Sequence, residues 1–85
     1  MGEVQVGRVA RYFGKVGVAA IEIHGGDLRI GDTIRIRGKT TDFSQTVESM
    51  EAEHQPIQTA VPGQLIGVKV RERAREDDVV YKEIP

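Results

Sequence analysis

An alternation of isoleucine with polar residues most constrains the fold of this chain. Within Ile30–Lys39, Ile34 and Ile36 fall on alternate positions, and the residues around them are polar: Thr33, Arg35 and Arg37. Successive side chains of a β-strand point to opposite faces, so this pattern buries one face and exposes the other. The Gly31-Asp32 pair supplies turn chemistry just before it. The stretch therefore predicts a tight turn that leads into an amphipathic strand.

Five further runs show a strand pattern, and glycine-bearing turns lie between many of them. With Ile30–Lys39 as the third, the predicted strands are Glu3–Phe13, Val18–Ile23, Phe43–Glu51, Leu65–Arg71 and Val79–Ile84. No stretch shows a long helical period. Short strands of this spacing indicate an all-β protein, and at this size a barrel removes exposed sheet edges more simply than a sandwich does. We therefore predict a six-stranded, closed antiparallel barrel.

Two of the predicted strands change phase part-way along. Val4 and Val6 share one face of the first strand, whereas Val9 lies on the other, and Gly7 stands where the phase changes. Met50 breaks the alternation of the fourth strand in the same manner. A β-bulge produces such a shift, and it bends the strand as a small barrel requires.

Two segments are expected to lie outside the strands. Glu53–Gln64 is the longest irregular stretch, and its prolines, Pro56 and Pro62, exclude it from the interior of a sheet. Glu72–Asp78 reads as a mixed-charge turn, and one helical turn at Arg73-Ala74-Arg75 would also be acceptable. We find no internal repeat and no linker, so residues 1–85 are predicted to form one domain.

Composition narrows the class of protein. The 85 residues are 39% hydrophobic and 29% charged, with a net charge of −1 and no cysteine. This composition fits a small globular domain without disulfides, and we expect a cytoplasmic protein. The N-terminus lacks the pattern of a signal peptide, and no apolar run has the length of a membrane span. The low net charge disfavours a protein that coats nucleic acid indiscriminately, although it leaves room for a local basic face.

The search for catalytic and cofactor sites yields no candidate. His24 and His54 have no partner at a metal-ligand spacing, and Ser44 and Ser49 lack the glycines of a nucleophile elbow. The Gly14-Lys15-Val16-Gly17 stretch reads as a hairpin turn rather than a phosphate loop, because it does not lead into a helix. We therefore expect no enzymatic activity, no metal, no cofactor and no GTP bound by this chain alone.

One concentrated positive surface stands out, on the exposed face of the third strand and its flanks. Arginine presents a planar fork that suits phosphate, and alternate strand positions place such side chains in a row. The candidate RNA-binding residues are Arg29, Arg35, Arg37 and Lys39. Tyr12 and Phe43 are candidates for base stacking. The alternative is that these charges form the solvated outer face of an ordinary strand.

Four segments in this order resemble a known family: Gly7–Val9, Ile30–Gly38, Val47–Met50 and Ala60–Val70. Together they resemble domain II of translational GTPases, the β-barrel that follows the GTP-binding domain in elongation factor Tu. Two longer stretches, Gly38–Pro56 and Val70–Lys82, resemble the short stand-alone proteins called translation elongation factor-like. Similar segments occur at the C-terminus of some collagenase-like peptidases. One departure is Asp77, at a turn position where the family pattern usually has glycine.

The resemblance implies a Greek-key-like barrel that acts as a binding module. In translation factors this domain contacts ribosomal RNA or the acceptor end of aminoacyl-tRNA, so the first hypothesis is a non-enzymatic module that contacts RNA through its basic strand face. Such a site would weaken steeply as salt rises. The alternative is a protein-interaction or accessory domain of a larger enzyme, such as a collagenase-like peptidase. It would use the Glu53–Gln64 loop or a barrel edge. A small ligand in the barrel mouth is less favoured, because side chains fill so small a barrel.

Overall fold

The structure is a computed structural model that describes residues 2–85, and its regular elements are ten β-strands. They are β1 (Gly2–Phe13), β2 (Val18–Ile23), β3 (Leu28–Arg29), β4 (Thr33–Arg37), β5 (Asp42–Thr46), β6 (Met50–Ala52), β7 (Gln55–Ile57), β8 (Thr59–Ala60), β9 (Leu65–Lys69) and β10 (Val79–Ile84). Within the described range, no helix has the length and apolarity to cross a membrane.

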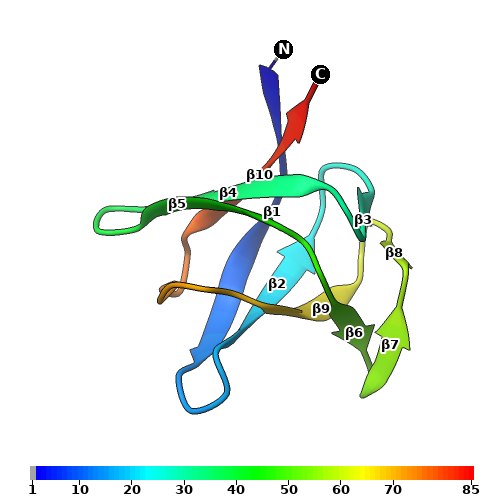
Figure 1. The fold of residues 1–85 in the computed structure, drawn as a ribbon, viewed down its shortest axis with the longest axis horizontal. Helices are drawn as coiled ribbons and strands as arrows, with labels where there is room; N and C mark the ends of the chain where they lie inside the picture. Colours follow the sequence, from blue (N-terminus) through cyan, green and yellow to red (C-terminus); the bar gives the residue numbers. More distant parts are fainter. Residues whose placement is uncertain (1) are drawn as a thin grey trace.

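Eight strands form one antiparallel sheet in the order β5-β4-β10-β1-β2-β9-β6-β7, and β3 pairs with β8 in a separate ladder. The strand pairs from β5 to β7 are all antiparallel. Figure 1 shows the two termini side by side, with the β4–β5 hairpin, the β1–β2 hairpin and the β6–β7 hairpin pointing in three different directions. The predicted all-β antiparallel fold is confirmed.

Closure of the barrel differs from the prediction. The predicted fourth strand, Phe43–Glu51, is split into β5 and β6, and these halves lie at opposite ends of the sheet. In residues 2–85 no backbone ladder joins β5 to a neighbour on its free side, so the closed ladder is not found. A side chain bridges that gap instead. The Gln45 amide donates to the Lys69 carbonyl at 2.8 Å and accepts from the Arg71 N–H at 2.8 Å.

The bulge that we predicted near Gly7 is confirmed. The register of β1 against β10 shifts between Gln5 and Gly7, and its register against β2 shifts again between Val9 and Arg11. A side chain at position 7 would overlap the carbonyl oxygen of Glu22 on β2, so glycine allows this close approach. With these two shifts, β1 pairs with β10 on one side and with β2 on the other.

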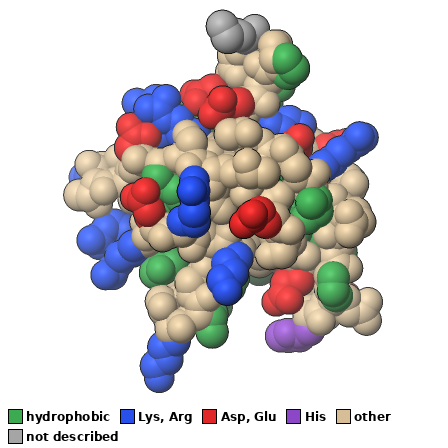
Figure 2. All heavy atoms as spheres, viewed as in Figure 1, with side chains coloured by type: hydrophobic (Ala, Val, Ile, Leu, Met, Phe, Trp, Pro, Cys, Tyr) green, Lys and Arg blue, Asp and Glu red, His purple; other side chains and the backbone are tan. Residues whose placement is uncertain are grey.

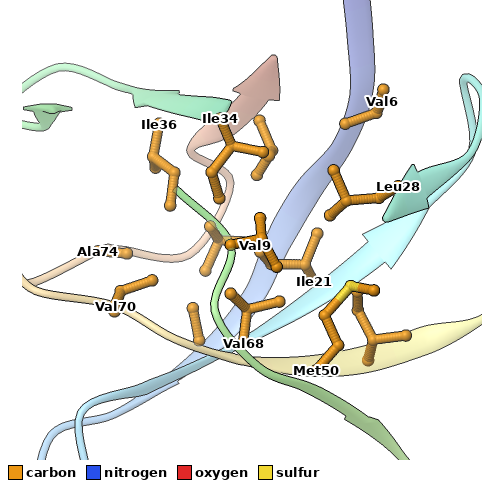
Figure 3. Close-up of a cluster of buried hydrophobic side chains, with 14 of the residues drawn as sticks. Val6, Val9, Ile21, Leu28, Ile34, Ile36, Met50, Val68, Val70 and Ala74 are labelled. Atoms are coloured by element: carbon orange, nitrogen blue, oxygen red, sulfur yellow. The ribbon is translucent and has the colours of Figure 1, made fainter. Parts of the chain in front are cut away.

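The core lies between the strands that the alternation predicted. Ile34 and Ile36 are fully buried while Arg37 is exposed, so the predicted phase of the third strand is correct. Figure 3 shows side chains from β1, β2, β4 and β6, with Leu28 and Val70, converging on one interior. Phe43, at 7% exposure, belongs to this core and is therefore not available for base stacking as we had suggested.

The segment Glu53–Gln64 is more regular than predicted, because it contains both β7 and β8. Pro56 lies on β7, the last strand in the sheet order, where a residue without an N–H is tolerated. The exclusion of this segment from the sheet interior is thus correct, although its description as irregular is wrong.

The turn that carries Asp77 keeps the geometry of a glycine turn. Asp77 has φ of 72°, in the left-handed region that glycine favours and that aspartate tolerates. Its carboxylate forms an ion pair with Arg8 at 2.8 Å. The next residue, Asp78, is buried and accepts a hydrogen bond from the Arg75 N–H at 2.8 Å, which closes a turn within the loop. The Asp77 N–H donates to the Val9 carbonyl and the Val9 N–H donates to the Asp78 carbonyl, both at 2.8 Å, and these bonds hold the loop against β1.

Candidate functional site

The basic residues predicted to bind RNA lie on three segments. Arg35 and Arg37 stand on the outer face of β4, Lys39 lies in the β4–β5 hairpin loop, and Arg29 belongs to β3, which pairs with β8 rather than β4. Figure 1 shows β3 and the β4–β5 hairpin at opposite ends of β4. The four residues thus extend along β4 and past both of its ends.

Arg35 is engaged within the protein. Its Nε and Nη2 donate to the two carboxylate oxygens of Asp42 at 2.8 and 2.9 Å, and Glu3 lies 3.7 Å from its Nη1. These hydrogen bonds hold the pKa of Asp42 below its usual value. The Arg35 fork is already occupied by a carboxylate, so it is poorly placed to bind phosphate.

The structure brings further cations next to Arg37 and Lys39. One hollow is lined by Arg37, Lys39 and Arg75, and an adjoining hollow, which shares Arg75, is lined by Arg11, Tyr12 and Arg73. We call Arg11, Arg37, Lys39, Arg73 and Arg75 the basic cluster. Among the described residues, none of the five forms an ion pair within 4.0 Å.

Three members of the basic cluster were not predicted from the sequence: Arg73 and Arg75, because Glu72–Asp78 was interpreted as a mixed-charge turn, and Arg11, which lies on β1. The alternating arginines of that turn were the available signal. Figure 2 shows Lys and Arg side chains, with acidic ones among them, on the side of the molecule where the β4–β5 hairpin lies. Glu76 and Asp77 line the hollows as well, so the surface has mixed charge with a positive excess.

A second surface, on β2 and β9, is apolar. A groove of about 340 Å³ runs between the β1–β2 hairpin and the β6–β7 turn. Its lining residues, which define the β2–β9 groove, are Phe13, Val16, Val18, Ala20, Glu51, Glu53, His54, Leu65, Ile66 and Gly67. Figure 2 shows hydrophobic side chains and a histidine exposed at the lower edge of the molecule, where these hairpins lie in Figure 1.

The floor of the groove is hollow because two small residues face each other. Ala20 on β2 pairs directly with Gly67 on β9, and outward positions of paired strands share one face. A Cβ atom at position 67 would come within 3.3 Å of Val18 and 3.5 Å of Glu51. A larger side chain at either member of the pair would therefore occupy the groove.

The walls of the groove expose large apolar side chains. Phe13, Val16 and Leu65 are 45%, 61% and 57% exposed, and they come from β1, the β1–β2 turn and β9. Single exposed apolar residues are normal, but a group around one hollow makes this groove a candidate interaction surface. The Arg11 guanidinium lies 5.9 Å from the centre of the Phe13 ring, so this wall adjoins the basic cluster.

The rim of the groove is acidic and is carried by a tight turn. Glu53 and His54 connect β6 to β7, and both have positive φ, 53° and 65°. Glycine and asparagine are the usual residues of such turns. Our prediction of a protein-interaction surface at Glu53–Gln64 includes this turn, but nothing in the sequence showed that it would face Ala20 and Gly67.

Comparison with known proteins relates the whole domain to others. The profile of the family described as Elongation factor Tu domain 2 matches residues 16–80. An uncharacterized protease of Methanocaldococcus jannaschii is 44% identical over 80 residues, which are 93% of this chain and 19% of the protease. A collagenase of Porphyromonas gingivalis is 41% identical over 81 residues, 94% of this chain and 20% of the collagenase. The chain therefore spans about a fifth of the length of these relatives.

Two solved structures have the same fold. The C-terminal domain of a putative U32 peptidase from Geobacillus thermoleovorans has a TM-score of 0.88 at 24% identity, with 95% of this chain and 93% of that chain covered. GDP-bound aIF5B from Aeropyrum pernix has a TM-score of 0.66 at 20% identity, with 99% of this chain and 15% of that chain covered.

Proposed function

The chain belongs to the elongation factor Tu domain 2 family, and from this premise we propose that it is a non-enzymatic binding module that serves as an accessory domain to a larger, peptidase-like protein. Protein contact through the β2–β9 groove is the interaction that its surface favours. The observation that carries the proposal is the exposure of Phe13, Val16 and Leu65 around one hollow.

The relatives support this assignment. A protease and a collagenase each contain a segment more than 40% identical to this chain, and that segment is about a fifth of their length. The domain of the U32 peptidase structure that it resembles is C-terminal. A domain repeatedly joined to one type of enzyme has a reason to contact it, and contact between domains of this size requires an apolar patch with a polar rim.

RNA contact is the second candidate function, and the basic cluster favours it. Its five cations have no carboxylate partner within 4.0 Å among the described residues, and Tyr12 lines the same hollow. Unpaired Arg and Lys beside an aromatic ring suit a nucleic-acid backbone and its bases. Arg37 and Lys39 stay in this proposal, whereas Arg29 and the paired Arg35 contribute less.

Affinity capture at two salt concentrations tests both functions. The tagged chain and two double variants, Phe13→Ser with Leu65→Ser and Arg73→Glu with Arg75→Glu, are incubated with lysate, and bound protein and RNA are identified. We expect a peptidase-family protein that is retained at moderate salt, kept by the arginine variant and lost by the groove variant. RNA that is lost with rising salt and with the arginine variant would instead select the second function.

A further inference from the structure

The β2–β9 groove combines an apolar floor with a rim of unpaired negative charge. Glu51 and Glu53 line it, and in residues 2–85 neither carboxylate has a cation within 4.0 Å. No Lys or Arg is among the lining residues, although Arg11 pairs with Ala20 from the β1 side and Lys69 shares a neighbouring hollow with Glu51. The groove therefore offers two interactions at once: burial of an apolar side chain and attraction of a positive charge.

The dimensions of the groove suit a side chain with its flanking backbone. About 340 Å³ is at the lower end of the range of small-molecule sites, which enclose most of their ligand. Here the walls are side chains that are 45–61% exposed, so the hollow is a shallow trough on a sheet face. An extended segment that inserts one apolar side chain and continues over the rim would fill it.

The backbone that carries the acidic rim is held by strand pairing. Glu51 on β6 pairs with Pro56 on β7 and with Gly67 on β9. The Cγ atom of Glu51 lies 3.5 Å from the point where a Cβ atom at position 67 would be. The turn that carries Glu53 is fixed by the pairing of Ala52 with Gln55 on either side of it. A backbone that is already fixed in its bound form does not have to be ordered on binding, and this lowers the entropic cost of association.

We infer that the groove binds an extended segment of a partner protein in which an apolar side chain is followed directly by Lys or Arg. The apolar side chain lies on Ala20 and Gly67 between Phe13 and Leu65, and the cation lies against Glu51 and Glu53. This inference rests on the proposed function and names the chemistry of the partner. Charge complementarity selects a basic segment, because an acidic one would face two carboxylates.

Peptide titration observed by NMR tests the inference on the intact chain. ¹⁵N-labelled protein is titrated with acetyl-GSLKSG-amide, with the acidic counterpart GSLESG and with GSSKSG, which lacks the apolar anchor. We expect the first peptide to shift amide signals of β2, β9 and the β6–β7 turn. It should bind about three- to tenfold more tightly than GSLESG at about 20 mM NaCl, with a smaller difference at about 0.5 M. GSSKSG should give no saturable shift.

Two variants provide the charge control. Glu51→Gln with Glu53→Gln should abolish the preference for GSLKSG over GSLESG and leave a folded protein. Glu48→Gln with Glu76→Gln, at exposed carboxylates outside the lining, should preserve the preference. Equal binding of GSLKSG and GSLESG to the unmodified chain, or a preference that survives Glu51→Gln with Glu53→Gln, would overturn the inference.

The remaining outcomes separate this inference from the proposed function. If none of the peptides binds while Phe13→Ser with Leu65→Ser still abolishes capture of a peptidase, the docking function stands and the occupant that we assign is wrong. Groove signals that shift with protein concentration alone would identify a second copy as the occupant, which also overturns it. Shifts confined to the basic cluster would do the same.

Discussion

The β4–β5 pair and the β2–β9 pair are both antiparallel and both cover the same core. Their outer faces differ in the side chains that the cross-strand pairing brings together. On the first, Arg35 pairs with Ser44 across the strands, and its long side chain is tied to Asp42. On the second, Ala20 pairs with Gly67, and these two small residues lie on the floor of the β2–β9 groove.

On the β4–β5 face the charged groups already have partners within the protein, whereas on the β2–β9 face the rim carboxylates do not. Arg35 and Asp42 satisfy each other, so a ligand would have to break an existing ion pair before it could bind there. The carboxylates of the groove have no cation within 4.0 Å among the described residues, and Val16 and Leu65 are more than half exposed, so their interactions remain available to a ligand. A row of arginines in the sequence therefore does not by itself predict free cations, because a neighbouring carboxylate can pair with them, as Asp42 pairs with Arg35.

The largest effect should come from the core that the two faces share. Ile34→Ala, beneath the β4 face, and Ile21→Ala, beneath the groove, each remove most of a side chain with no exposed surface. We expect each to lower the free energy of unfolding by about 2–4 kcal/mol in urea titration. A loss under about 1 kcal/mol for either one would show that its strand does not face the core.

The next largest effect should come from Gln45, the buried residue whose side chain connects β5 to the end of β9. Gln45→Leu removes the amide that joins β5 to the end of β9, and leaves the Lys69 carbonyl and the Arg71 N–H without that partner. We expect a loss of about 1–3 kcal/mol in unfolding free energy. Gln5→Leu, at an exposed position of β1, is the matched control and should change it by less than about 0.5 kcal/mol. Equal effects of the two substitutions would mean that the Gln45 hydrogen bonds do not stabilise the junction between β5 and the end of β9.

Removal of an apolar wall should affect binding and leave stability unchanged. Leu65→Ser should lower the affinity for the captured partner by about tenfold, because it removes an apolar side chain from the wall of the groove. The thermal unfolding midpoint should stay close to that of the unmodified protein. Val61→Ser is a control at an exposed valine outside the lining. If Val61→Ser weakens binding as much as Leu65→Ser, the groove is not the docking surface.

The strained turn at the rim should become more stable with glycine. His54→Gly relieves a positive φ at the cost of a more flexible unfolded chain, and we expect a gain of about 0.5–1 kcal/mol in chemical denaturation. Asp77→Gly should gain less, because aspartate tolerates this conformation and the ion pair with Arg8 is lost. A loss of stability in His54→Gly would indicate that the imidazole contributes a contact of its own.

The ion pair of the β4 face predicts a small effect that depends on pH. The pKa of Asp42 is lowered in the folded state, so its contribution is present at neutral pH and disappears as pH falls through that lowered pKa. The unfolding midpoint of Asp42→Asn should therefore lie below that of the unmodified protein at pH 7, and the two should converge in acid. In an Arg35→Gln background the same substitution should have little effect at any pH. A difference that persists in acid would assign the role of Asp42 to something other than its charge.

Local patterns predicted most of the fold. The ends of β2 and β10 and the phase of Ile34 and Ile36 follow from alternation, because each strand position is buried or exposed according to its own side chain. The bulge at Gly7 followed from a break in the same pattern. The resemblance to translation-factor domain II is confirmed at the level of the fold by the family match and by aIF5B, and the accessory-domain alternative has more support than the RNA hypothesis.

Local patterns failed where distant segments meet. The β3–β8 pairing, the ladder left open beside β5 and the placement of Arg75 beside Arg37 depend on how strands bend and align. No short stretch contains that information. The split of the predicted fourth strand has the same cause, since its two halves pair with different neighbours.

The sequence by itself determined an all-β antiparallel domain, the faces of its strands and the place of its first bulge, because burial of alternate side chains is a local requirement. The tertiary structure alone decided that Ala20 would lie opposite Gly67 and that Asp42 would form an ion pair with Arg35. Cross-strand register brings these residues together, and register is a property of the whole sheet. The candidate site of this protein is therefore a consequence of pairing rather than of any motif.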